Sequence, residues 1–161
     1  MLFRSDKLVE QSRRKFGQKN FNGALEDLNQ AVKDNPRYAK AYNGRGLVKF
    51  VLKDFRGAIV DYNMAIILDP KFARAYSNRG MLKAYQDDFD NALKDFSLAI
   101  ALDPNLADAY NNRGSVYVKV GKRDAAIKDI EKAARLYEVQ GDKELARRAL
   151  ETIKKLNRVR V

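Results

Sequence analysis

Three arginines recur at intervals of 34 residues, and each is followed 16 residues later by an aspartate: Arg45 and Asp61, Arg79 and Asp95, Arg113 and Asp129. A guanidinium and a carboxylate can form an ion pair or, in a pocket, take part in acid–base catalysis. Each arginine lies on a helix face that otherwise carries packing residues, where an unpaired charge would be costly. We therefore expect arginine–aspartate pairs that join two helices, and a catalytic role is the weaker interpretation.

The residue types that serve most catalytic and metal sites are missing. The chain has no histidine and no cysteine, which excludes the commonest general base, the commonest metal ligand and any thiolate. It also contains no nucleophile–base pair and no glycine-rich phosphate loop, because the glycines at 44, 46, 80 and 114 suit close helix packing instead. The sequence predicts a protein that is not an enzyme and that needs no cofactor and no metal.

The period of 34 residues extends through most of the chain. Pro36, Pro70 and Pro104 follow it, and four segments can be aligned, 5–38, 39–72, 73–106 and 107–140, with alanine at the twentieth and twenty-seventh place of each. In the third segment Ala92, Phe96 and Ala99 lie on one helical stripe. Each segment therefore encodes two amphipathic helices. Asp54 and Asp88 stand where a side chain can cap the second helix, and the prolines mark its end.

This pattern resembles the tetratricopeptide repeat, a helix pair with recurrent aromatic, glycine, alanine and proline places. The fourth place is Leu8, Tyr42, Tyr76 and Tyr110, and the eighth is Ser12, Gly46, Gly80 and Gly114. The resemblance covers nearly the whole chain. It implies an all-α, right-handed superhelical solenoid of four helix-turn-helix units. The departures Leu8, Ser12 and Glu138, the last in place of a proline, fall in end repeats, where atypical residues are expected.

Two further departures have structural consequences. The eleventh place, commonly tyrosine in this family, is lysine in the first three repeats, so we expect a local change of packing around Lys15, Lys49 and Lys83. A solenoid also needs a cap for its last helix, and residues 141–156 suit this role, with Leu145, Ala149, Ile153 and Leu156 as the buried stripe. We expect one domain over residues 1–156, followed by a frayed basic tail at 157–161.

In this family function usually lies on the concave face, which is lined by the first helix of each repeat. The resemblance places these residues in that groove: Lys40, Asn43, Leu47, Val51, Arg74, Ser77, Asn78, Met81, Tyr85, Asp108, Asn111, Asn112, Ser115 and Lys119, with Val9 and Arg13 from the first repeat. An apolar strip thus runs beside asparagines, which can both donate to and accept from a peptide backbone. We expect a protein–protein interaction scaffold that binds a peptide or protein segment there. The competing interpretation is that the asparagines only solvate the helices.

Chaperone-binding members of the family hold a C-terminal carboxylate with lysine or arginine and asparagine at set places. Arg74 and Asn78 match one such repeat, but Val9 and Gly44 stand where the preceding lysine and asparagine are expected. If the next three repeats are taken instead, Asp108 stands where a lysine is expected. We therefore do not expect a dedicated carboxylate clamp. An acidic partner still fits Lys40, Arg74 and Lys119.

The formal net charge of +11 raises the question of nucleic acid. Basic and acidic residues are interleaved, and no aromatic stacking platform or recognition-helix motif is present, which argues against it. We favour a solvated surface that steers acidic partners. No membrane span and no signal-peptide core are recognisable, so we expect a cytoplasmic protein. The alternative function is self-association, in which the apolar groove residues or an exposed first helix with Phe16 and Phe21 dock on another copy, giving a homo-oligomer.

Overall fold

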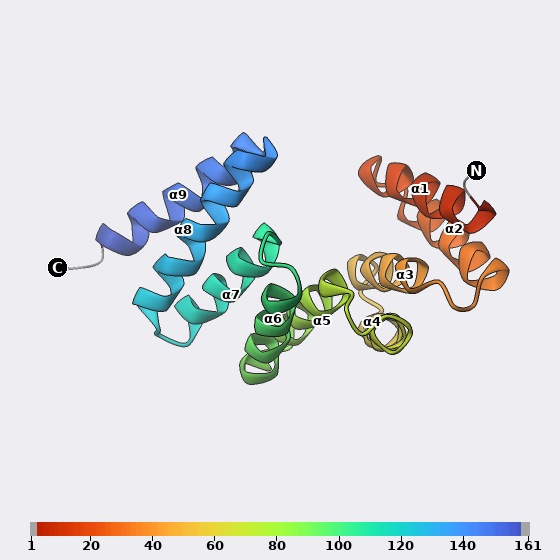
Figure 1. The fold of residues 1–161 in the computed structure, drawn as a ribbon, viewed down its shortest axis with the longest axis horizontal. Coiled ribbons are helices and arrows are strands. Elements are labelled where there is room, and N and C mark those ends of the chain that lie inside the picture. Colours follow the sequence, from red (N-terminus) through yellow and green to blue (C-terminus); the bar gives the residue numbers. More distant parts are fainter. Residues whose placement is uncertain (1–2, 159–161) are drawn as a thin grey trace. The chain divides into compact units, whose positions relative to one another are not determined.

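The computed structural model describes residues 3–158, which form helices and short turns without a strand. Its helices are α1 (Arg4–Gly17), α2 (Phe21–Asp34), α3 (Ala39–Val51), α4 (Phe55–Leu68), α5 (Ala73–Tyr85), α6 (Phe89–Leu102), α7 (Ala107–Lys119), α8 (Arg123–Gln140) and α9 (Lys143–Arg158) (Figure 1). They belong to two compact units that divide between Leu82 and Lys83. The predicted all-α class, with two consecutive helices in each repeat and a last helix after them, is confirmed.

Side-chain caps define where three of the four second helices begin. Asn20, Asp54 and Asp88 are the N-caps of α2, α4 and α6, and each side chain accepts the backbone N–H of the third residue that follows. The same helices end at residues with extended backbone that directly precede the three prolines. The capping roles predicted for Asp54 and Asp88 are therefore confirmed.

In the N-terminal unit, α1 packs against α2 and α3 packs against α4. Buried Ala24, Leu28 and Val48 form one cluster, and Phe16 and Phe21 pack against it with their ring centroids 5.2 Å apart. Both side chains are half-buried, and the expectation that Phe16 and Phe21 dock on another copy stays a prediction.

A second cluster of the same unit joins α4 and α5 through Ala58, Tyr62 and Leu82, and Phe50 of α3 packs against it. Gly46 of α3 lies against this cluster, where a Cβ atom would stand 2.7 Å from Cε1 of Tyr62. The recurrent glycine therefore allows the two helices of a pair to approach closely.

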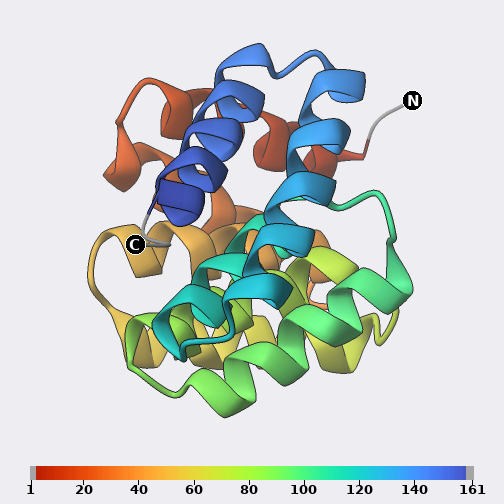
Figure 2. The same cartoon turned by 90° about the vertical axis from the view of Figure 1, so that its left-hand side faces the viewer.

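In the C-terminal unit, α8 packs against both α7 and α9, and Figures 1 and 2 show α8 and α9 as an antiparallel hairpin. Helix α8 has 18 residues, whereas the other second helices have 14. The proline of the earlier repeats is missing here, so α8 continues to Gln140 and ends at Gly141, whose φ of 84° is left-handed. The extra turn adds Tyr137, which joins Leu136, Ala107 and Ala146 in a core cluster.

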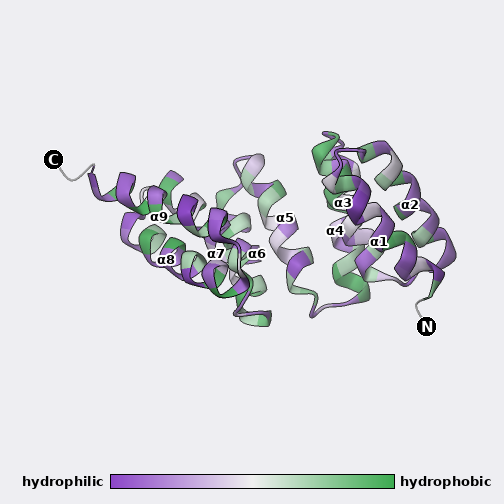
Figure 3. Ribbon diagram, turned by 90° about the horizontal axis from the view of Figure 1, so that it is seen from above, coloured by the Kyte–Doolittle hydropathy of each residue, from purple (hydrophilic) through white to green (hydrophobic). Residues whose placement is uncertain are grey.

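Helix α9 caps this unit but differs from the prediction in two details. Leu145, predicted to be buried, is 38% exposed, and Ala146, at 3%, takes its place on the stripe that faces α8 with Ala149, Ile153 and Leu156. Figure 3 shows the mixture of hydrophilic and hydrophobic turns along α9. The helix also includes residues 157 and 158, so these two residues do not belong to a frayed tail. Residues 159–161 of the predicted tail lie outside the described residues.

Candidate protein-binding face

Two of the three predicted arginine–aspartate pairs are present. Arg45 donates to Asp61 through Nε at 2.9 Å and Nη2 at 2.7 Å, and Arg113 donates to Asp129 through the same two nitrogens at 2.7 and 2.9 Å. Both carboxylates are buried, and the hydrogen bonds to them raise the pKa of the Arg45 and Arg113 side chains. The third pair, Arg79 and Asp95, stays a prediction.

The lysines that stand at the eleventh place, where the family commonly has tyrosine, form ion pairs. Lys15 lies 2.8 Å from Asp27, Lys49 lies 2.8 Å from Asp61, and Lys83 lies 2.8 Å from Asp95. Each lysine therefore pairs with an aspartate of the following helix. Sequence reasoning missed these pairs, although the separation of 12 residues between lysine and aspartate repeats three times.

The same arginines also connect successive repeats. Nη1 of each donates to a side-chain oxygen on the second helix of the preceding repeat: Arg45 to Asn29 at 3.2 Å, Arg79 to Asn63 at 2.8 Å and Arg113 to Ser97 at 3.1 Å. Each guanidinium additionally lies 5.3–5.9 Å from the ring of the tyrosine three residues before it. These contacts describe a structural junction rather than a catalytic group.

In the N-terminal unit, the predicted groove residues divide by exposure. Asn43 and Ser77 are buried, and Nδ2 of Asn78 donates to Oδ1 of Asn43 at 2.9 Å, which ties α5 to α3. The exposed residues of this part of the set are Lys40, Val51 and Arg74, whereas Leu47, Asn78 and Met81 are half-buried. One asparagine pair thus holds the helices together, so its capacity to bind a peptide is partly used.

The predicted residues of the C-terminal unit also make internal contacts. Asp108 accepts a hydrogen bond of 2.6 Å from the buried Tyr137, Ser115 donates to the backbone oxygen of Asn111 at 2.9 Å, and Nζ of Lys119 lies 5.4 Å from the Phe89 ring centroid. Tyr85 is exposed, and Asn111 and Asn112 are half-buried. Sequence reasoning did not single out Tyr137, because its role depends on the extra turn of α8. Burial and the bond to Asp108 raise the pKa of its hydroxyl.

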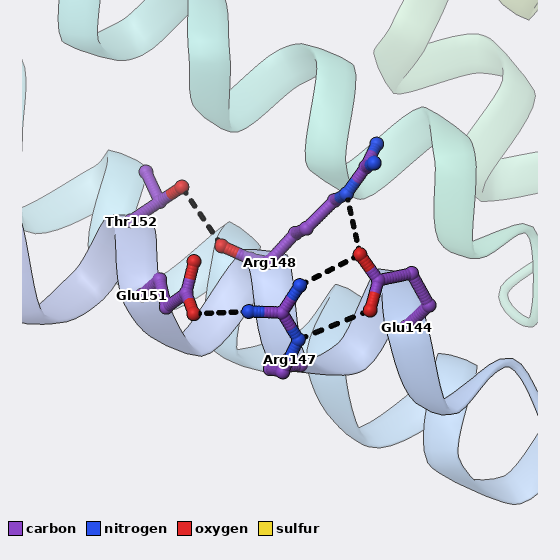
Figure 4. A network of polar contacts seen from close by, with 5 residues as sticks. All are labelled: Glu144, Arg147, Arg148, Glu151 and Thr152. Atoms are coloured by element: carbon purple, nitrogen blue, oxygen red, sulfur yellow. Dashed lines mark hydrogen bonds and ion pairs between the residues drawn. The ribbon is translucent and has the colours of Figure 1, made fainter.

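The outer side of α9 carries ion pairs within the helix. The Glu144 carboxylate accepts from Arg147 and Arg148, and Arg147 also donates to Glu151 (Figure 4). The bonds from the two arginines lower the pKa of Glu144. Over residues 3–158 no helix is long and apolar enough to cross a membrane.

Known proteins match the chain by sequence pattern and by fold. Models described as tetratricopeptide repeat match residues 39–72 and 107–140, and one described as TPR repeat matches residues 83–121. No curated protein matches the sequence.

Many solved structures share the fold. The TPR2B domain of yeast Sti1, in a complex with pHsp70, is 26% identical with a TM-score of 0.70, covering 76% of this chain and 98% of that one. MamA is 25% identical with a TM-score of 0.65, covering 98% and 95%. The first TPR domain of Spaghetti (RPAP3), bound to the HSP90 peptide SRMEEVD, is 24% identical with a TM-score of 0.67, covering 73% and 94%.

Proposed function

Because the chain belongs to the tetratricopeptide repeat family, we propose that it is a non-catalytic scaffold that binds a segment of another protein along the face of its first helices. Proteins of this family generally serve as interaction scaffolds. The TPR2B domain of yeast Sti1, which is similar over three quarters of this chain, was solved as a complex with pHsp70. The proposal transfers this kind of interaction to the present chain and leaves the identity of the partner open.

The observation that carries the proposal is the hydrogen bond between Asn78 and Asn43, because it fixes α5 beside α3. Residues one turn further along each helix point to the same side, so Leu47 and Met81 share one face. Both side chains are half-buried, and Val51 lies a further turn along α3 with its side chain exposed. This apolar face suits the side chains of a bound segment.

The charges at the start of these two helices favour an acidic segment. Lys40 and Arg74 occupy the second place of successive repeats, are both exposed, and form no ion pair in the described part of the chain. Free cations beside an apolar face attract a segment that carries both carboxylates and apolar side chains. Because Gly44 and Asp108 replace clamp residues, we propose recognition along the segment rather than of a terminal carboxylate. We place this interaction in the cytoplasm.

A displayed library of random 12-residue peptides tests the proposal. Peptides selected on the natural chain should bind at least about tenfold more weakly to a Leu47→Lys/Met81→Lys variant, since two apolar contacts are replaced by charges. The matched control is Val139→Lys at the end of α8, because that side chain is 87% exposed and lies outside the predicted face. Far-ultraviolet circular dichroism verifies that all variants fold. Binding that survives in the double variant, or that is lost equally in the control, contradicts the proposal.

A further inference from the structure

The outer side of α4 carries two exposed apolar side chains. Val60 is 61% exposed and Ile67 is 71% exposed, whereas Ala58, Tyr62 and Ala65 of the same helix are completely buried. At 100° per residue, Val60 and Ile67 lie on the side of the helix opposite to these three residues. We call the exposed row Arg56, Val60, Asn63 and Ile67 the α4 strip.

The other repeats show that the fold does not require apolar residues at these places. Val60 and Ile67 are the twenty-second and twenty-ninth residues of their repeat, and the equivalent residues are exposed in every repeat: Glu26 and Lys33 in α2, Lys94 and Ala101 in α6, Lys128 and Arg135 in α8. Only α4 places a large apolar side chain at both. Single exposed apolar residues are ordinary, but a pair aligned on one helix face, at places held by charged residues or alanine in the other repeats, indicates a contact surface.

We infer that the α4 strip packs antiparallel against the α4 strip of a second copy of this chain. The strip is self-complementary, because an antiparallel arrangement sets Val60 opposite Ile67 of the second copy and brings Asn63 close to the two-fold axis. Arg56 in the first turn then lies toward the end of the other helix, where Asp69 directly follows the last residue. The Asp69 carboxylate therefore lies near Arg56 at both ends of the contact, although Lys71 two residues further on reduces the net attraction. The two helix dipoles run in opposite directions, which favours the contact.

The contact is small, and this sets the strength of the dimer. Two apolar side chains per copy bury much less than the roughly 1,000 Å² of a stable interface. The net charge of +11 on each copy also opposes association at low salt. We therefore expect a weak dimer that dissociates on dilution and that forms more readily as salt screens the repulsion.

The cysteine-free sequence allows a direct test with single-cysteine variants. Helices that pack 8–10 Å apart, with Cα atoms about 2.3 Å from each axis, bring facing Cα atoms to within roughly 3.5–5.5 Å, close to the distance across a disulfide. Asn63→Cys at the centre of the strip should therefore form a disulfide-linked dimer in diamide at least about tenfold faster than the control variants.

The controls occupy the same place of other repeats. Asn29 and Ser97 accept a hydrogen bond from the next repeat's arginine, as Asn63 does, so Asn29→Cys and Ser97→Cys impose a matched structural change. A further variant combines Asn63→Cys with Val60→Glu and Ile67→Lys, which are the residue types that α2 has at these two places. This triple variant should cross-link no faster than the controls. Equal cross-linking of all three single variants, or fast cross-linking that survives in the triple variant, would overturn the inference.

Solution mass provides a second measurement on the unmodified chain. Sedimentation equilibrium should show a mass that rises with protein concentration and with salt, and Val60→Glu/Ile67→Lys should remain monomeric over the same range. A natural chain that stays monomeric to about 1 mM would overturn the inference, and would leave another protein as the occupant of the strip. Unchanged circular dichroism of the double variant ensures that a monomer is not an unfolded chain.

Discussion

Replacement of Tyr62 by phenylalanine should stabilise the protein, although it removes a polar group from the core. The Tyr62 side chain is completely buried between α3, α4 and α5, and its hydroxyl has no hydrogen-bond partner in the described structure. Burial, together with the nearby Asp61 charge, raises the pKa of this hydroxyl, as expected for a group held in an apolar environment. The equivalent residues of the other repeats are Leu28, Phe96 and Ile130, all apolar.

The size of the effect follows from two opposing contributions. A buried hydroxyl without a partner costs about 1–3 kcal/mol of desolvation, which phenylalanine avoids. The space left by one oxygen atom costs a few tenths of a kcal/mol, at about 24 cal/mol per Å³ of residual cavity. We therefore expect Tyr62→Phe to raise the free energy of unfolding by about 1 kcal/mol, which corresponds to roughly 2–4 °C in Tm for a chain of this size.

The matched control is Tyr137→Phe, since this tyrosine is also buried but its hydroxyl donates to Asp108 at 2.6 Å. Loss of a hydrogen bond to a carboxylate should destabilise the protein by about 1–2 kcal/mol, so the two substitutions should change stability in opposite directions. Urea unfolding followed by circular dichroism at pH 7 measures both, with the slope used to verify that the denatured state is unchanged. A decrease of 1 kcal/mol or more for Tyr62→Phe would refute the reasoning, because the hydroxyl would then have a partner such as a bound water.

Three further substitutions test the remaining contacts. Asp61→Asn should lower the free energy of unfolding by about 2–3 kcal/mol in urea, because two partly buried cations lose their shared carboxylate; a change below 0.5 kcal/mol would contradict this. Gly46→Ala should lower it by about 1–3 kcal/mol, since the new Cβ would overlap the Tyr62 ring, and an unchanged Tm would contradict that clash. Burial and the bond to Asp6 raise the pKa of Tyr38 to about 12. Its stabilising contribution is therefore complete below about pH 10 and disappears as the pH rises to about 12, and solvent screening reduces it to about 1 kcal/mol. Tyr38→Phe should be less stable at pH 8 because it lacks the bond to Asp6, and should show a smaller decline in Tm between pH 10 and 12 because it has no hydroxyl to ionise. An identical decline in both proteins would exclude the raised pKa.

The repeat pattern predicted the fold well because each 34-residue segment determines the structure of its own helix pair. The caps Asp54 and Asp88, the glycine at position 46 and the alanines of the second helices all act within one pair of helices, so their effects could be predicted from local spacing. The cap was placed less accurately, since Leu145 and Ala146 both fit an amphipathic stripe. The side that packs is decided by the rotation of α9 on α8, and the sequence of α9 alone does not encode that rotation.

The candidate site was harder to predict, because it depends on contacts between repeats. Asn43 and Asn78 were expected beside each other in a groove, yet they bond to each other and Asn43 is buried. Asp108 likewise accepts from Tyr137, and this bond exists only because α8 continues beyond the place where a proline would have ended it. Polar side chains on a repeat face therefore have two uses, binding a ligand and joining neighbouring helices. Spacing alone does not distinguish them.

The basic composition also takes on a different meaning once the pairs are known. Asp61 accepts from both Arg45 and Lys49, so one buried carboxylate holds two cations and leaves one positive charge in excess. Substitution of Asp61 should therefore lower the stability more than substitution of Arg45 or Lys49, because a carboxylate that loses one cation still has its second partner. It also holds these two side chains between helices, where they are not free to contact phosphate groups. A part of the positive charge that suggests nucleic acid in the composition is thus used to join the helices of a repeat. This agrees with the proposed protein partner, which would be attracted to exposed cations such as Lys40 and Arg74.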